Sequence, residues 1–232
     1  MNPTANPQEL LERLGVDIDA ETLRLALTHR SYAYEHEGQG HNERLEFLGD
    51  SVLGLAVTDE IFHRYPDDSE GSLAKIRSAV VSTRTLAELA RSLGVGPHIR
   101  LGKGEVRTHG HEKASILADT MEALIGAVYV CSGLEPARAF VLRLVVPLLE
   151  DGFVVTEGRD WKTEIQELAA ARGLGGVRYD VEGTGPDHDR RYEAHLLISG
   201  QDYGTGTGTT KKEAERSAAA QAYAALAARS GV

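Results

Sequence analysis

The sequence predicts an α+β fold in two parts, an all-helical domain over residues 1–150 and a small α-β-β-β-α domain over residues 160–229. Apolar residues recur at helical spacing through the first part. From 192 to 198, by contrast, residues of alternating polarity follow one another, as in a half-buried strand. Residues 151–159 show no strong periodicity, so we expect them to form a linker.

Caps and breakers set the expected helices of the first part. Pro66 forbids continuation of a helix that includes residues 42–51. Ser69 suits a helix start, whereas Gly94 and Gly133 suit helix ends. The expected order is an early helical region that ends at 28–31, helices to about 63, over 69–81 and over 83–93, a glycine-rich loop over 94–112, a helix that ends at 133 and a last helix from 135.

The second part has a different order of elements. Gly173 should stop its first helix, and the turn residues of 183–189 indicate a loop. The expected order is a helix over 160–171, strands over 177–182, 192–198 and 203–209, and an alanine-rich helix over 210–228.

Residues 42–51 place three carboxylates, Glu43, Glu46 and Asp50, within one narrow sector of a helix. The opposite sector carries the expected core residues Leu45, Leu48, Val52 and Leu55. Like charges at these spacings cost a helix a few tenths of a kcal/mol per pair. Something cationic is therefore expected against the acidic face.

A second helix has the same construction, because Asp119 and Glu122 lie on a face opposite an apolar stripe. Glycines at 49, 54 and 126 cost helix propensity, so they indicate close packing between helices. Carboxylates converging from two such helices would form an oxygen-only pocket, which suits Mg²⁺ or Mn²⁺. The simpler interpretation is that each acidic face is only solvated.

Composition narrows the function classes. With 35 acidic against 25 basic residues, the chain would not attract nucleic acid by bulk charge. Residues 158–232 hold 11 acids and 10 bases, so the acid excess lies in residues 1–157. A lone Cys131 is expected to be a small buried side chain. The absence of an apolar 18-residue run and of a secretion-type N-terminus predicts a cytoplasmic protein with no membrane span.

Residues 41–55, with Glu70-Gly71 and Ser115–Ala123, resemble the nuclease domain of the ribonuclease III family. The resemblance includes its signature Asn-Glu-Arg-Leu-Glu-Phe-Leu-Gly-Asp, here residues 42–50. The α-β-β-β-α segment resembles the double-stranded RNA-binding domain that usually follows this nuclease domain. The resemblance covers nearly the whole chain, and the family's acidic positions are intact.

The resemblance implies a metal-holding and catalytic set of four acids: Glu46, Asp50, Asp119 and Glu122. Within it, Glu122 would be an essential ligand and Asp50 would position the attacking water. Glu43 and Glu70 would be accessory acids, and Phe47 an apolar contact in a homodimer. The implied activity is Mg²⁺-dependent cleavage of double-stranded RNA, with Mn²⁺ as a substitute, to 5′-phosphate and 3′-hydroxyl ends with short 3′ overhangs. The implied role is processing and decay of rRNA and mRNA.

RNA binding would use local groups of the second part. Lys211 and Lys212 stand where a helix N-terminus already favours phosphate. The resemblance assigns minor-groove contacts to Thr163 and Gln166 on the first helix and to His188 in the loop. Taken alone, the lysine pair and Gln166 would more simply be solvated surface groups.

Other functions fit the sequence less well. A non-cleaving double-stranded RNA-binding regulatory protein is the main alternative, but such a scaffold has no use for four clustered acids. A metal-dependent phosphatase, or a nuclease for other substrates, does not explain the RNA-binding segment. The segment His109-Gly110-His111 lacks the further ligands of a zinc site and is interpreted as loop.

Overall fold

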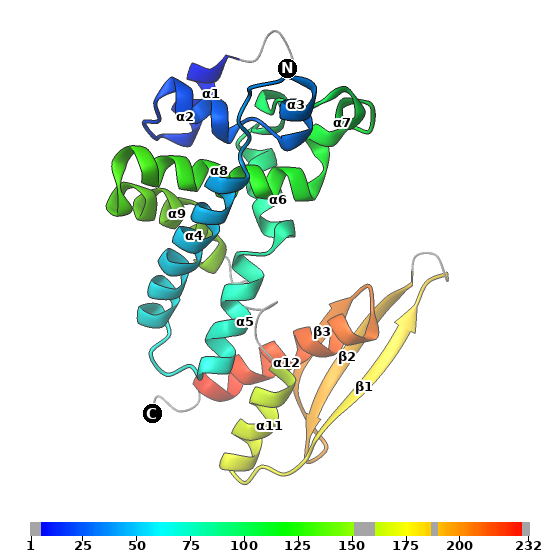
Figure 1. Ribbon diagram of the computed structural model, residues 1–232. Helices are drawn as coiled ribbons and strands as arrows, with labels where there is room; N and C mark the ends of the chain where they lie inside the picture. The colour runs from blue at the N-terminus through cyan, green and yellow to red at the C-terminus, as the bar shows by residue number, and fades with distance from the viewer. Residues whose placement is uncertain (1–5, 151–160, 187–189, 229–232) are drawn as a thin grey trace. The chain divides into compact units, whose positions relative to one another are not determined.

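The computed structural model describes residues 6–150, 161–186 and 190–228. The chain forms two compact units, residues 1–158 and 159–232. A helical unit is followed by a three-stranded antiparallel sheet with flanking helices, which confirms the predicted α+β fold class (Figure 1). The expected linker, residues 151–159, lies outside the described residues.

The helical unit is built around two long helices, α4 (Glu43–Arg64) and α8 (Ala114–Ser132). Around them lie the shorter helices α1 (Pro7–Leu14), α2 (Ala20–Ala26), α3 (Arg30–Glu35), α5 (Glu70–Val80), α6 (Thr83–Ser92), η1 (Gly96–His98), α7 (Lys103–Arg107), η2 (Gly110–Glu112) and α9 (Leu134–Glu150). α4 and α8 pack directly against each other, and α6 and α9 both pack on α8 (Figure 1).

Two glycines let the backbones of α4 and α8 touch. A Cβ placed on Gly49 would overlap the carbonyl of Glu122, and one on Gly126 would overlap the carbonyl of Leu45. Each glycine therefore faces the partner helix's main chain where any side chain would hold the helices apart. The expectation of close packing is confirmed at Gly49 and Gly126, whereas a Cβ on Gly54 would meet nothing within 4 Å.

The buried face of α4 differs in part from the expected one. Leu45 and Val52 are buried as predicted, but Leu55 is 57% exposed and Leu48 only partly buried. The core instead takes residues beside the acidic sector, including Gly49 and Leu53. The periodic pattern shows correctly which residues of α4 share a face, but it does not show which face is buried. In this fold α8 covers the face that carries Gly49.

The predicted caps define α5, α6 and α8. The Ser69 hydroxyl accepts a hydrogen bond from the Ser72 N–H (3.3 Å), and Gly133, at φ +85°, follows the last residue of α8. Residues 28–31 do not end the early helical region, because His29 caps α3 and the segment joins α2 to α3.

The expected loop over residues 94–112 is wrong, since it contains η1, α7 and η2. Groups far away in the sequence fix these short helices. The Gly102 N–H donates to the Ser31 hydroxyl (2.9 Å), and the Lys103 N–H donates to the Glu35 carboxylate (2.8 Å). Isolated helices of this length are unstable in water, so tertiary contacts decide their conformation.

Cys131 is exposed, which corrects the expectation of a buried thiol. Its Sγ donates to Asp19 Oδ2 (3.2 Å), and that carboxylate also caps α2. α8, which carries Cys131 near its end, has the length and hydropathy of a membrane-crossing helix. In the most apolar window of α8, however, 61% is buried inside the unit, as expected for the central helix of a packed core.

The second unit has the order α11 (Trp161–Ala171), β1 (Val177–Thr184), β2 (Arg191–Ile198), β3 (Gln201–Gly208) and α12 (Lys211–Ala228). The strands pair antiparallel in the order β1-β2-β3, and α11 and α12 pack against each other (Figure 1). The predicted alternation in β2 is confirmed, because Ala194, Leu196 and Ile198 are buried.

Small residues join the sheet to α12. Gly204, Gly206 and Gly208 line the face of β3 that meets α12, and a Cβ on any of them would overlap atoms of that helix. Opposite them, α12 presents a row of fully buried alanines, Ala214, Ala218 and Ala222. The helix therefore lies almost on the backbone of the strand.

Replacement of Gly126 by Ala should destabilise the helical unit, because the new methyl group must push α8 away from the Leu45 carbonyl. We expect the free energy of unfolding to fall by about 3 kcal/mol, at the upper end of the costs typical of overpacking. Gly104→Ala, in α7, is the matched control, since its Cβ would meet nothing within 4 Å. Urea denaturation of both variants checks this, and equal stability would contradict the close crossing.

Candidate functional site

Three carboxylates converge where α4 crosses α8. Glu46 lies in the first turn of α4, and Asp119 and Glu122 lie on adjacent turns of α8. One oxygen from each can be chosen so that all three lie within 4.8 Å of one another. All three side chains are partly buried. The glycine contacts lie next to them, because the Glu122 carbonyl itself meets Gly49.

The burial of these acids changes their proton affinity. Burial, with the negative charges of Asp50, Glu46 and Asp119, raises the pKa of Glu122 to about 7. Burial also raises the pKa values of Glu46 and Asp119, and in Glu46 the charge of Asp119 adds to the effect. The site therefore binds protons more readily than free carboxylates do, unless a cation neutralises it.

The fourth predicted acid, Asp50, lies at the edge of this group. Its side chain is exposed, and it is not among the carboxylates that meet within 4.8 Å. Its charge nevertheless contributes to the raised pKa of Glu122. The structure thus brings three of the four acids together, with Asp50 close enough to act on them electrostatically.

A basic side chain lies against one end of the acidic sector. Arg30, the first residue of α3, forms an ion pair with Glu43 (3.3 Å). Its charge also lowers the pKa values of Glu46 and Asp119, although less than burial raises them. Glu43 is half exposed and lies outside the three-acid group, so Arg30 only partly offsets the charge of the cluster.

Sequence reasoning missed His29 as a neighbour of this site. Its ring is partly buried, and burial lowers its pKa, while the charges of Glu105 and Asp119 act in the opposite direction. The Ser31 N–H donates to His29 Nδ1 (3.2 Å), which fixes the ring at the start of α3. The run Thr28–Ser31 could have indicated this position. We interpreted it as the end of a helix, whereas it leads into the N-terminus of α3, which His29 caps.

Two further predicted residues lie away from the three acids. Glu70 is the exposed first residue of α5 and is not part of the group. Phe47 is 79% exposed, and it shares one face of α4 with Leu55 and Phe62, which are 57% and 62% exposed. Three large apolar side chains are thus uncovered along a single helix face.

The three carboxylates fit a hard divalent ion. They offer only oxygen ligands, and such sets suit Mg²⁺, Mn²⁺ or Ca²⁺. The group carries an excess of negative charge in a partly buried position, which a divalent cation would compensate. A purely solvated acidic face does not explain the burial of all three side chains.

In the second unit, four of the five predicted RNA-binding residues are described. Thr163 and Gln166 are exposed on α11, and Lys211 and Lys212 are exposed in the first turn of α12. His188 lies outside the described residues. A helix N-terminus that carries two exposed lysines is a favourable place for phosphate.

Two glutamates beside these lysines are already engaged. Glu213 accepts hydrogen bonds from the backbone N–H and the hydroxyl of Thr209 (both 2.8 Å), which lowers its pKa. Glu215 forms an ion pair with Lys162 of α11. Both carboxylates are therefore held by neighbours within the unit, while Lys211 and Lys212 point to solvent.

Comparison with known proteins agrees with this arrangement. Residues 19–149 match the family described as Ribonuclease-III-like, and residues 161–226 match the double-stranded RNA binding motif. The chain is 56% identical to ribonuclease 3 of Mycobacterium tuberculosis over 222 residues, which cover 94% of this chain and 92% of the relative. It is 57% identical to ribonuclease 3 of Nocardia farcinica over 224 residues, covering 95% and 93%.

A solved structure supports the same assignment for the helical unit. The nuclease domain of ribonuclease III from Campylobacter jejuni superposes with a TM-score of 0.57 at 40% identity, covering 61% of this chain and 97% of that domain. That structure is described as showing flexibility in a region involved in dimer formation. The chain belongs to the ribonuclease III family, and is an endoribonuclease with a divalent-metal-dependent nuclease unit and a double-stranded RNA-binding unit.

Proposed function

We propose that the protein is a Mg²⁺-dependent endonuclease that cleaves double-stranded RNA to 5′-phosphate and 3′-hydroxyl ends with short 3′ overhangs. It acts as a cytoplasmic homodimer in the processing and decay of rRNA and mRNA. The observation that carries the proposal is the meeting of Glu46, Asp119 and Glu122 from two helices within 4.8 Å.

Glu46, Asp119 and Glu122 would hold the magnesium ion, and Mn²⁺ would substitute because it accepts the same oxygen ligands. When bound, the ion supplies an activated water and stabilises charge on the phosphate oxygens. Asp50, at the exposed edge of the group, accepts a hydrogen bond from the attacking water and orients it toward phosphorus. Glu43 and Glu70 would act as accessory acids at the margin.

The exposed apolar face of α4 supports the homodimer. Phe47, Leu55 and Phe62 are large side chains on one helix face, and each is more than half exposed within the described chain. Burial of such side chains is worth about 1.5–3 kcal/mol each, so a second copy is a favourable cover. The description of the Campylobacter domain, at 40% identity, also refers to dimer formation.

The second unit would recognise the shape of the RNA duplex rather than its sequence. Lys211 and Lys212 would meet phosphates across the major groove, while Thr163, Gln166 and His188 would meet the minor groove. The exposure of Lys211 and Lys212 in the first turn of α12 supports a contact with phosphate there, and Glu213, which its lowered pKa keeps ionised, weakens the positive patch.

Replacement of Glu122 by Ala should abolish cleavage and leave duplex binding intact. We expect the cleavage rate of a long RNA duplex in Mg²⁺ to fall by at least about 100-fold, since one of three ligands is lost. Gel-shift binding in Ca²⁺ should match that of the wild type. Glu88→Ala removes an exposed acid paired with Arg84 on α6 and is the control, expected to cut normally. Normal cleavage by the Glu122 variant would refute the assignment, and an inactive wild type would favour the non-cleaving alternative.

The raised pKa of Glu122 makes stability depend on pH in metal-free buffer. Because the native pKa is about 7 and the ordinary value is 4.5, the folded state loses stability as pH rises from 4.5 to 7, and the full cost persists above 7. Glu122→Gln removes this cost. Because solvent screens this partly exposed carboxylate, we expect the variant to exceed the wild type in free energy of unfolding by only about 1–2 kcal/mol at pH 8, with little difference at pH 4.5.

Denaturation with chelator present measures this difference, and addition of Mg²⁺ should reverse the order at pH 8, because the ion stabilises only the wild type. If the wild type and Glu122→Gln were equally stable at both pH values, ionisation of Glu122 would carry no cost in the folded state.

Replacement of Lys211 and Lys212 by Ala should weaken binding to every RNA duplex by a similar factor. Each lysine that contacts a phosphate contributes about 0.9 to the slope of log affinity against log salt, so the slope should fall by about 1–2. Arg178→Ala removes a cation of the same unit that is paired with Asp180, and should leave the slope unchanged. Fluorescence anisotropy over a range of salt concentrations distinguishes the two, and an unchanged slope for the lysine variant would rule out their role.

A further inference from the structure

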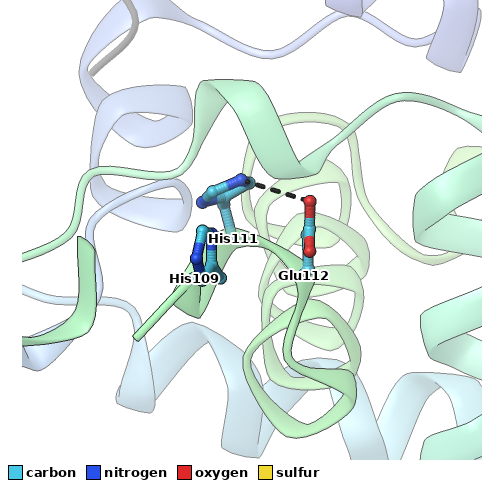
Figure 2. A group of neighbouring side chains, drawn as sticks. All are labelled: His109, His111 and Glu112. Atoms are coloured by element: carbon cyan, nitrogen blue, oxygen red, sulfur yellow. Dashed lines mark ion pairs between the residues drawn. The ribbon is translucent and has the colours of Figure 1, made fainter. Parts of the chain in front are cut away.

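A second group of possible metal ligands lies in the segment that precedes α8. The side chains of His109, His111 and Glu112 offer ligand atoms that all lie within 4.8 Å of one another. Figure 2 shows the two imidazole rings next to each other, with the Glu112 carboxylate beside His111. The ring centroids are 6.0 Å apart. None of these residues belongs to the carboxylate group at the helix crossing.

The backbone that carries these side chains is held on several sides. Gly110 is buried, and a Cβ there would press on Glu105 at 3.0 Å. The His111 carbonyl lies against Gly96, where no Cβ fits. The Glu112 carbonyl accepts a hydrogen bond from Arg91 Nη2 (3.1 Å). The main chain is thus fixed before any ligand binds, and only side-chain rotations remain.

The neighbouring Lys113 does not compete for the carboxylate of Glu112. Its Nζ donates to Glu105 (2.7 Å) and to Thr108 (2.8 Å) instead. Within the described chain, one basic side chain lies close to the Glu112 carboxylate, that of His111, at 3.6 Å between Nε2 and Oε1. That separation is too long for a hydrogen bond. Two imidazoles and one carboxylate are therefore available to bind one metal ion.

The spacing suits a small transition-metal ion. Zinc bonds to nitrogen and oxygen of about 2.0–2.1 Å in a tetrahedron separate neighbouring ligands by roughly 3.4 Å. The His111–Glu112 separation of 3.6 Å is already close to this value, and the remaining separations, up to 4.8 Å, shorten by side-chain rotation.

We propose that His109, His111 and Glu112 bind a borderline transition-metal ion such as Zn²⁺, with an open coordination position for water. Imidazole ligands favour Zn²⁺, Cu²⁺ or Ni²⁺ over Mg²⁺, which prefers oxygen. The chain would thus carry two cation sites of different chemistry, one of oxygen ligands at the helix crossing and one of mixed ligands at η2.

The test is calorimetric titration of Zn²⁺ into the full chain with excess Mg²⁺ present to occupy the carboxylate group. We expect one equivalent to bind to the wild type, and binding to the double variant His109→Asn, His111→Ala to be at least about tenfold weaker. Asn at position 109 tolerates the left-handed backbone found there, φ 54°. Circular dichroism and thermal unfolding without zinc verify that this variant is folded.

Two further variants locate the ion. His63→Ala removes an exposed histidine of α4 and should bind zinc like the wild type, as should Glu122→Gln. Glu112→Gln should bind zinc more weakly than the wild type. The proposal is overturned if the wild type binds no zinc, if the double histidine variant binds as tightly as the wild type, or if binding is lost in Glu122→Gln.

Discussion

The backbone contact between α4 and α8 is the constraint on which the nuclease unit depends. Gly49 and Gly126 remove the side chains that would separate the helices, so the main chains touch at Glu122 and Leu45. Glu46 precedes Gly49 by one turn, and Glu122 precedes Gly126 by one turn, so the contact that packs the helices also brings their acids together. A wider crossing would preserve both helices and still lose the site.

This arrangement has an electrostatic cost. Glu46, Asp119 and Glu122 are partly buried near one another, and burial together with mutual repulsion raises the pKa of Glu122 to about 7. Arg30 lies close enough to reduce the repulsion, but it acts more weakly than burial. The apolar core of α8, which includes Leu117, Met121 and Leu124, must hold the acids in place. Without a cation, the three carboxylates repel one another, and the packed core holds them together. A divalent cation from solution would relieve this repulsion, so the site is suited to bind one.

The sequence predicted the long helices and the acidic faces because their signals are local. Ser69 and Gly133 mark helix ends through groups within a few residues. The short helices between 94 and 112 depend on Ser31 and Glu35, about 70 residues away, so no local pattern reveals them. Leu55 and Cys131 were misplaced for a related reason, since a periodic pattern defines a face but not the element that covers it. Convergence of the acids was predictable only because the glycines indicated which faces meet.

The net charge of the chain does not predict RNA binding, because acidic and basic side chains are concentrated in different parts of the protein. The chain carries a net charge of −10, yet an RNA duplex experiences the local field, which falls off over about 8 Å at physiological salt. In the second unit, β3 glycines let α12 lie flat on the sheet by its alanine face, so Lys211 and Lys212 project from the free end. Glu213 is turned back toward Thr209 and Glu215 toward Lys162. Packing by small residues thus decides where the charges stand in both units: it gathers acids at the crossing of α4 and α8, and it leaves lysines uncovered at the start of α12.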